Sequence, residues 1–317
     1  MASISNVKLR LLFLIVLVFV ANFILIVTTR AERLQTTAWT PVVMWHGMGD
    51  TAHGSIEVIK RSLESKYPGM YVLSIQIGNS VVEDELASYF GNANEQVDEA
   101  CRQVLSDNRI TKHGSLNVIG FSQGGQLSRA LVQRCPLTEN NVTVKNYISL
   151  GGQHQGVFGL PHCSSDNELC KYARYLIETA VYSPLVQPHV IQAQYWHDPI
   201  NDKEYREKST FLADINNERA INETYRKNIL KLQNMVLVMF ANDEIMVPRE
   251  SATFGFYNKN LSKVESMNET ELYQQDRLGL KSLNQSQRLS LITIPGGHLQ
   301  FKMRWFMYFI ATKYLSN

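Results

Sequence analysis

A serine between two glycines is the first candidate for chemistry in this sequence. Residues 120–124 read Gly-Phe-Ser-Gln-Gly, which places Ser122 at the centre of a G-x-S-x-G pattern. An apolar run precedes this pattern and residues with helical spacing follow it, which is typical of a sharp turn from a strand into a helix. The glycines are required because a Cβ at either position would clash in such a turn. The pattern predicts that Ser122 is a nucleophile, with a serine in an ordinary tight turn as the alternative.

A serine hydroxyl becomes a good nucleophile only when a base takes its proton and an acid orients that base. In hydrolases with this turn, the order along the chain is nucleophile, acid, histidine. Of the eight histidines, only His298 follows the apolar run that ends at Phe240. We therefore predict His298 as the base. Asp243 directly follows the same run and is the predicted acid, with Glu244 and Asp214 as alternatives.

Attack on a carbonyl creates an oxyanion, which two preorganised backbone N–H groups typically stabilise. The residue after the nucleophile, Gln123, is expected to supply one of them. The second is expected from Met48, because residues 46–50 read His-Gly-Met-Gly-Asp and form a glycine-rich loop after an apolar run.

The elements that would position these groups alternate between strands and helices. Strands are predicted at residues 41–45, 71–75, 116–119, 144–150, 235–240 and 289–294, and helices at 56–63, 97–105, 126–135 and 302–314. This alternation favours an α/β fold with a mostly parallel central sheet flanked by helices. Such sheets carry their chemistry at the carboxyl ends of the strands, where all the candidate groups lie.

The pattern changes between residues 153 and 234. No strand is predicted there, and apolar and aromatic residues recur at helix-like intervals. The segment is too long for a simple connection. We expect a helical insertion that covers the site, between core segments 32–152 and 235–317.

The first 31 residues read as a secretory signal peptide. Lys8 and Arg10 precede an apolar run from residue 11 to residue 27 that only Asn22 interrupts. Cleavage is expected after Ala31, and an uncleaved membrane anchor is the alternative because the run is long. N-glycosylation is predicted at the asparagines of five N-x-S/T patterns, Asn141, Asn222, Asn260, Asn268 and Asn284.

The four cysteines are an even number in a chain expected to meet an oxidising compartment. We predict the disulfides Cys101–Cys135, between consecutive helices that flank the nucleophile strand, and Cys163–Cys170, which closes a short loop. A metal site built from His162, Cys163 and Cys170 is the competing interpretation. No metal or cofactor is expected.

Length and charge set broad limits. The 317 residues carry a formal charge of +2 and are 44% hydrophobic, which is ample for a packed core. No block of basic residues occurs, so the composition does not suggest a nucleic-acid partner.

Longer motifs are more specific than the serine pattern. Residues 45–50 read Trp-His-Gly-Met-Gly-Asp, residues 120–125 read Gly-Phe-Ser-Gln-Gly-Gly, and residues 151–161 read Gly-Gly-Gln-His-Gln-Gly-Val-Phe-Gly-Leu-Pro. With these motifs, and with further agreement at 195–199, 211–215 and 276–280, the chain closely resembles the palmitoyl-protein thioesterase family. The likeness extends from about residue 41 to the C-terminus. One departure is visible, because adjacent cysteines of the family are replaced here by Thr51 and Ala52.

The resemblance implies a soluble α/β-hydrolase of the lysosome lumen that removes long-chain fatty acyl groups from cysteine thioesters. Its expected partners are S-palmitoylated proteins and peptides, and long-chain acyl thioesters such as palmitoyl-CoA. The protein would reach the lysosome through the secretory pathway, and secretion from the cell is also expected. The resemblance carries the nucleophile, acid and base onto Ser122, Asp243 and His298.

The resemblance also implies that the inserted segment forms the acyl-binding groove. The residues expected to line it are Leu176, Val181, Leu185, Val190, Ile191 and Trp196. Alternatively, these side chains form only the insertion's own core.

The triad itself does not distinguish a thioester from an oxygen ester. A secreted lipase or esterase on the same fold is therefore one alternative function. A lumenal lipid-binding protein with an inactive hydrolase fold is another, although it would require a broken triad.

Overall fold

A computed structural model describes residues 17–22, 39–159 and 179–316, and the chain divides into two units, Met1–Trp39 and Thr40–Asn317. In the first unit, residues 17–22 are helical. No helix within the described residues has both the length and the apolar character needed to cross a membrane. The predicted signal peptide falls largely outside the described residues and stays a prediction.

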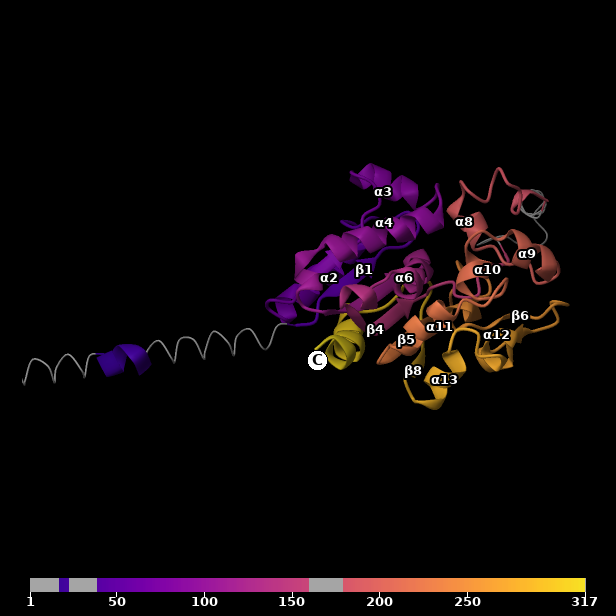
Figure 1. Ribbon diagram of the computed structural model, residues 1–317. Coiled ribbons are helices and arrows are strands. Elements are labelled where there is room, and N and C mark those ends of the chain that lie inside the picture. Colours follow the sequence, from indigo (N-terminus) through magenta and orange to yellow (C-terminus); the bar gives the residue numbers. More distant parts are fainter. Residues whose placement is uncertain (1–16, 23–38, 160–178, 317) are drawn as a thin grey trace, which may run out of the picture. The chain divides into compact units, whose positions relative to one another are not determined.

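A six-stranded parallel sheet forms the centre of the second unit (Figure 1). Its strands, in spatial order, are β2 (Val72–Ser74), β1 (Val42–Trp45), β3 (Ser115–Phe121), β4 (Thr143–Leu150), β5 (Asn234–Phe240) and β8 (Leu289–Ile294). Every neighbouring pair runs parallel. The predicted α/β fold with a parallel sheet flanked by helices is confirmed, and each predicted strand forms within two residues of its expected bounds.

Burial explains why these segments are strands. β1 and β3 are almost continuously buried, as expected for central strands that are covered on both faces. β8 lies at the edge, and its buried and exposed residues partly alternate. Since successive side chains point to opposite faces, Val43 and Trp45 contact one layer of helices while Val42 and Met44 face the other.

Helices cover both faces of the sheet. The helices of the core segments are α2 (Ser55–Lys66), α3 (Val81–Ala87), α4 (Ala93–Ser106), α5 (Asn108–Thr111), α6 (Gln123–Arg134), α12 (Glu271–Gln274), α13 (Leu280–Gln285), α14 (Met303–Trp305) and the π-helix η4 (Phe306–Leu315). Short 3₁₀ turns are η1 (Thr138–Asn140), η2 (Arg249–Thr253) and η3 (Met267–Glu269). α4 packs on α6, and α2 packs on η4.

Two predicted helices, α4 and α6, are longer than expected. α4 begins after Asn92, whose side chain accepts a hydrogen bond from the N–H of Asn94, and it buries Val97, Ala100 and Val104 at helical spacing. α6 begins directly after Ser122 rather than three residues later, and ends before Pro136.

The sequence did not predict α3 or a small antiparallel hairpin of β6 (Phe256–Tyr257) and β7 (Val264–Glu265). Both elements are short, and α3 lacks the inward apolar stripe by which a surface helix is usually recognised. Most of α3 is exposed, and Asp84 is its one buried residue.

The described residues between 153 and 233 contribute no strand to the sheet, and Asn234 begins β5. Their helices include α8 (Ile191–Gln194), α9 (Asp202–Lys208), α10 (Leu212–Ile215) and α11 (Glu223–Leu230). This helical character agrees with expectation, while its assignment as a cap domain stays a prediction.

The disulfide between Cys101 and Cys135 is present and joins α4 to the end of α6. The predicted pair Cys163–Cys170 lies outside the described residues, as does His162 of the competing metal site.

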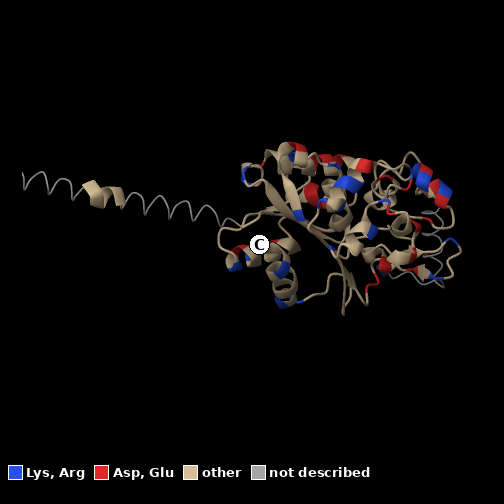
Figure 2. Cartoon of the chain, turned by 60° about the horizontal axis from the view of Figure 1, so that its bottom comes forward, with Lys and Arg blue, Asp and Glu red and all other residues tan. Residues whose placement is uncertain are grey.

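Figure 2 shows acidic and basic residues interspersed over the helices, in keeping with the small net charge.

Candidate active site

Ser122 occupies the turn between β3 and α6 in a conformation that few L-residues adopt. Its φ of 51° and ψ of −125° are outside the helical and strand regions. The flanking glycines allow this turn because the chain is crowded there. A Cβ on Gly120 would lie 2.4 Å from the carbonyl oxygen of Gly124, and one on Gly124 would lie 2.3 Å from the carbonyl oxygens of Trp45 and His46. The β3–α6 turn therefore presents the hydroxyl in a fixed position.

A continuous chain of hydrogen bonds joins the serine, the predicted base and the predicted acid. Nε2 of His298 lies 2.7 Å from Oγ of Ser122, and Nδ1 of His298 lies 2.6 Å from Oδ2 of Asp243. The second oxygen of Asp243 accepts bonds from the N–H groups of Ile245 and Met246, each at 3.0 Å. The fully buried Asp243 side chain thus fixes the imidazole with Nδ1 towards the carboxylate and Nε2 towards the serine.

The parallel sheet brings these residues together. Ser122 follows β3, Asp243 follows β5, and His298 follows β8, and all three lie at the carboxyl ends of their strands. The two alternative acids are placed differently. Asp214 lies in α10 and accepts a hydrogen bond from the Tyr225 hydroxyl at 3.0 Å, and Glu244 is exposed.

The glycine-rich loop after β1 lies directly against the nucleophile. A Cβ on Gly47 would lie 3.0 Å from Cβ of Ser122, so the loop approaches as closely as only glycine permits. The N–H groups of Met48 and Gln123 donate no hydrogen bond to any described residue. Two donors without acceptors are what an oxyanion site requires. Their role as that site stays a prediction.

A buried pair beneath this loop was not expected from the sequence. Nε2 of His46 lies 3.1 Å from Oδ1 of Asp84, and Nδ1 of His46 lies 2.9 Å from the carbonyl oxygen of Gly47. Burial by itself would lower the pKa of His46, but the hydrogen bond and charge of Asp84 outweigh it and the pKa is raised. No sequence signal separates Asp84 from the other acidic residues of α3.

An apolar cavity of about 390 Å³ opens beside Ser122. Its lining residues are Met48, Ser122, Gln153, Val157, Gly159, Ala180, Val181, Val186, Val190, Gln192, Ala193, Tyr195, Trp196 and Ile245. Most come from residues 153–196, the beginning of the segment predicted to form the acyl groove.

Three of the six residues predicted for this groove line the cavity, namely Val181, Val190 and Trp196. Two of the others do not line it. Leu185 is 82% exposed, because its side chain points to solvent, and Ile191 is fully buried in the core instead of facing the cavity. Leu176 lies outside the described residues.

Gln153 is a site residue that sequence reasoning did not assign. Its Nε2 lies 3.4 Å from Oγ of Ser122, and its side chain lines the cavity. Gln153 lies in the Gly-Gly-Gln motif after β4, and its place at a strand end was the available signal.

The side chain of Gln123 is also held in place, because its Oε1 accepts hydrogen bonds from the Tyr195 hydroxyl at 3.1 Å and from Nε2 of Gln192 at 3.2 Å.

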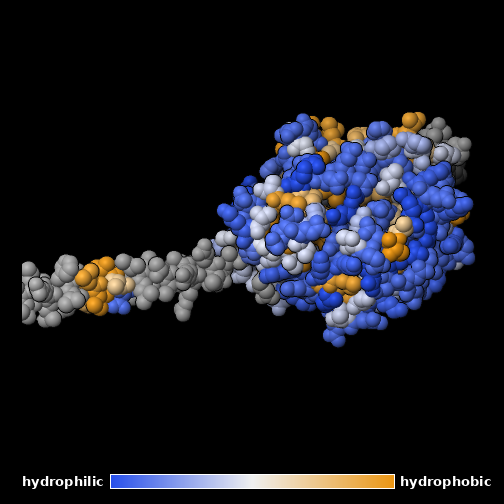
Figure 3. Space-filling model, in the orientation of Figure 1, coloured by the Kyte–Doolittle hydropathy of each residue, from blue (hydrophilic) through white to orange (hydrophobic). Residues whose placement is uncertain are grey.

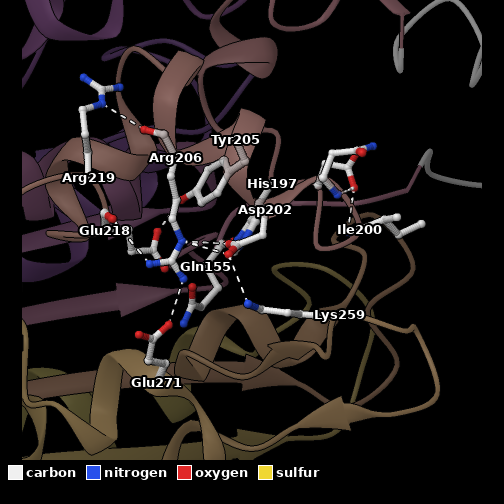
Figure 4. Close-up of polar contacts among 12 residues, drawn as sticks. Gln155, His197, Ile200, Asp202, Tyr205, Arg206, Glu218, Arg219, Lys259 and Glu271 are labelled. Atoms are coloured by element: carbon white, nitrogen blue, oxygen red, sulfur yellow. Dashed lines mark hydrogen bonds and ion pairs between the residues drawn. The ribbon is translucent and has the colours of Figure 1, made fainter.

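A second pocket, of about 440 Å³, is polar and contains none of the triad residues. Figure 4 shows Arg206 of α9 reaching towards Asp202 and towards Glu271 of α12, with nitrogen to oxygen distances of 2.9 Å to each. The ring of His197 stacks between Tyr205 and another aromatic ring. These contacts hold α9 against the core.

Two further predictions concern a metal site and N-glycosylation. Among residues 17–22, 39–159 and 179–316, no group of three or more His, Cys, Asp or Glu side chains is arranged to hold a metal ion. The asparagines of all five N-x-S/T patterns are exposed. Glycosylation stays a prediction.

A parallel sheet with a strained serine at a strand-to-helix turn, hydrogen-bonded to a histidine from the last strand, defines the class of α/β-hydrolase enzymes. The family model for palmitoyl protein thioesterases matches residues 41–298, and the chain belongs to this family of thioester hydrolases. It is 46% identical to palmitoyl-protein thioesterase 1 of Caenorhabditis elegans over 92% of this chain and 96% of that one.

More distant relatives share the same region. Palmitoyl-protein thioesterase 3 of Dictyostelium discoideum is 36% identical over 83% of this chain and 86% of its own. Lysosomal thioesterase PPT2 of Homo sapiens is 30% identical over 82% of each chain.

Proposed function

We propose that this protein removes long-chain fatty acyl groups, such as palmitate, from cysteine residues of proteins and peptides, with Ser122 as the nucleophile. The observation that carries the proposal is the position of Ser122. Its hydroxyl is hydrogen-bonded to His298 and also lies at the wall of an apolar cavity. One atom therefore belongs both to a proton-transfer chain and to a site suited to an acyl chain.

In the first step, Oγ of Ser122 attacks the thioester carbonyl carbon while Nε2 of His298 takes its proton. The negative charge moves to the carbonyl oxygen, which the N–H groups of Met48 and Gln123 stabilise. Asp243 stabilises the imidazolium that forms. The hydrogen bond from His298 Nδ1–H to Asp243 keeps the ring in the required orientation.

In the second step, the tetrahedral intermediate breaks its carbon–sulfur bond. The cysteine thiolate leaves and receives the proton from Nε2 of His298, and the acyl group remains as an ester on Ser122. A water molecule then attacks this ester with His298 as the base. The carbon–oxygen bond to Ser122 breaks, the fatty acid leaves, and the serine recovers its proton.

The cavity favours binding of a long acyl chain over binding of a short one. Val181, Val190 and Trp196 contribute apolar surface, and each methylene transferred from water to such a surface gains up to about 0.8 kcal/mol. Gln153, a polar residue of the lining, lies 3.4 Å from Oγ of Ser122, where the thioester would bind.

We propose the lysosome lumen as the place of action, reached through the secretory pathway. The human relative named above is called a lysosomal thioesterase. The disulfide between Cys101 and Cys135 agrees with passage through an oxidising compartment.

The test compares hydrolysis of a palmitoyl-cysteine peptide with hydrolysis of its oxygen-ester analogue, for wild type and Ser122→Ala. We expect the wild type to prefer the thioester and the variant to lose activity on both. Preference for the oxygen ester would favour a lipase or esterase. Failure of a fluorophosphonate probe to label Ser122 would favour an inactive lipid-binding protein.

A further inference from the structure

Helix α3 presents its apolar residues to solvent, and its one buried residue is an aspartate, Asp84. Val82, Leu86 and Phe90 are 66%, 52% and 60% exposed, and their spacing of four places them along one side of the helix and its continuation. On the inner side, Asp84 is 1% exposed. A surface helix normally has the opposite arrangement.

The inner side of α3 accounts for how the helix is held. Asp84 accepts hydrogen bonds from the N–H groups of Ala52 and Ile77, at 2.8 and 2.7 Å, in addition to its contact with His46. The hydroxyl of Ser88 accepts from the N–H of Gly49 at 2.8 Å. Polar contacts therefore fix the helix, and its outer apolar side chains are not needed for that purpose.

The outer side of α3 continues into the segment that lines the apolar cavity. Phe90 forms an isolated bridge with Val190, the N–H of Gly91 donates to the carbonyl of His189 at 2.9 Å, and Val190 lines the cavity. Leu185, 82% exposed, precedes the cavity residue Val186 in the same segment. Figure 3 shows hydrophobic surface at the upper edge of the molecule, over α3 and over the loop before α8.

We propose that Val82, Leu86, Phe90 and Leu185, here called the apolar collar, dock the enzyme onto the surface of an uncharged or zwitterionic lipid bilayer. This inference rests on the proposed function. A long acyl chain on a peptide partitions into a bilayer, so it must leave hydrocarbon before it can enter the cavity. An apolar surface that lies beside the cavity and inserts shallowly into the bilayer would shorten the path of the acyl chain through water.

The charges around the apolar collar indicate which kind of lipid surface it would bind. Glu83 and Glu85 are exposed on α3, whereas no lysine or arginine occurs from residue 78 to residue 97 or from residue 179 to residue 202. Membrane-surface helices that prefer anionic lipids are rich in Lys and Arg. The collar must therefore bind through apolar burial, and anionic lipid should weaken the binding.

The test uses the full chain, produced in a host that secretes it. Intact mass is measured to confirm that each variant carries the same modifications as the wild type. The collar variant is Val82→Ser/Leu86→Ser/Leu185→Ser. The control variant is Val58→Ser/Ile221→Ser/Leu291→Ser, which changes three apolar residues of 60%, 54% and 47% exposure that lie elsewhere. A third variant, Val82→Ile/Leu86→Met/Leu185→Met, retains the apolar character of the collar.

Three measurements are made on each protein: flotation with phosphatidylcholine vesicles, hydrolysis of a palmitoyl-cysteine peptide held in those vesicles, and kcat/KM on a soluble short-chain thioester. We expect the collar variant to lose about tenfold or more in vesicle partitioning, with a matching loss of turnover in vesicles. Its activity on the soluble thioester should stay unchanged. The control and apolar variants should match wild type.

Equal flotation and equal vesicle turnover of the collar and control variants would overturn the proposal. So would tighter binding to vesicles that contain phosphatidylserine. A loss of turnover on the palmitoyl-cysteine peptide with unchanged flotation would point to a peptide-binding role of the collar and would also overturn the proposal. Absence of activity on the soluble thioester in wild type would instead refute the proposed function, while flotation would still test the collar.

Discussion

Nε2 of His46 lies 3.1 Å from Oδ1 of Asp84, and both side chains are almost fully buried under the loop that carries Met48. Burial by itself would raise the pKa of Asp84, but its hydrogen bond with His46 and the charge of the ring outweigh this effect, and the pKa is lowered. The pKa of His46 is raised by the same contact. The two shifts favour a charged pair in mildly acidic solution.

We predict that this pair makes stability depend on pH. A raised histidine pKa stabilises the folded state below its ordinary value of about 6.5, and this contribution is lost as pH rises through the raised value. A lowered aspartate pKa stabilises above its ordinary value of about 3.9, and this contribution is lost as pH falls through the lowered value. Asp84→Asn should therefore lower the free energy of unfolding most between about pH 4 and 6.5.

Urea unfolding of wild type and Asp84→Asn across pH 4 to 9 measures this dependence. A residual difference should remain at high pH, because Asp84 also accepts two backbone N–H bonds. The control is Asp98→Asn, which removes an exposed contact with Arg134 at 3.7 Å and should change stability little at any pH. A difference for Asp84→Asn that is constant over the whole range would contradict the prediction.

Ser122→Ala and His298→Ala should each lower kcat by several orders of magnitude, and the double variant should be little worse than either. The reason is that Oγ and Nε2, 2.7 Å apart, act as one proton-transfer unit. Single-turnover and steady-state assays on a soluble acyl thioester give the three values. Losses that multiply in the double variant would show that the two residues act independently.

Asp243→Asn should fold normally and lower kcat by about 10⁴-fold, because an amide cannot hold the required tautomer of His298. Asp214→Asn is the matched control. Its carboxylate accepts from Tyr225 and should affect kcat only slightly. A large kcat loss for Asp214→Asn together with a small one for Asp243→Asn would reverse the choice of acid.

Chain-length preference should follow the residues that face the cavity. Val181→Trp or Val190→Trp should reduce kcat/KM for sixteen-carbon thioesters more than for eight-carbon ones, because filling the cavity removes up to about 0.8 kcal/mol, or roughly fourfold, for each methylene excluded. Leu185→Trp, at an exposed position, should leave the profile unchanged. Substrates stay below their micellar concentrations, and a wild-type profile that is flat from eight to sixteen carbons would exclude an acyl site here.

Removal of the disulfide should destabilise the protein without altering the active site. Cys101 and Cys135 are separated by 34 residues, a loop for which closure restrains the unfolded chain by about 3–4 kcal/mol. Cys101→Ser/Cys135→Ser should lower the free energy of unfolding by roughly this amount, while kcat/KM at low temperature stays near wild type. The intact mass of the wild type shows whether this disulfide has formed. Free thiols at both positions would remove the basis of the prediction.

The sequence by itself determined the sheet and predicted the positions of the nucleophile, acid and base. Apolar runs followed by glycine or polar residues predicted all six strands, because burial on both faces of a parallel sheet leaves a continuous local signal. The chain order of nucleophile, acid and histidine then left only His298 as the base. The hydrogen bonds of Ser122, His298 and Asp243 agree with this reading because parallel strands bring their carboxyl ends to one edge.

Tertiary structure alone decided which side chains face the cavity and which face solvent. Residues 181–189 form turns despite their helix-like apolar spacing, so that spacing did not assign their faces. Leu185 is exposed while the adjacent Val186 lines the cavity. Likewise, the sequence did not predict α3, and its apolar residues lie outside because Asp84 and Ser88 bond residues distant in sequence. Such orientations depend on long-range contacts, which a local pattern does not contain.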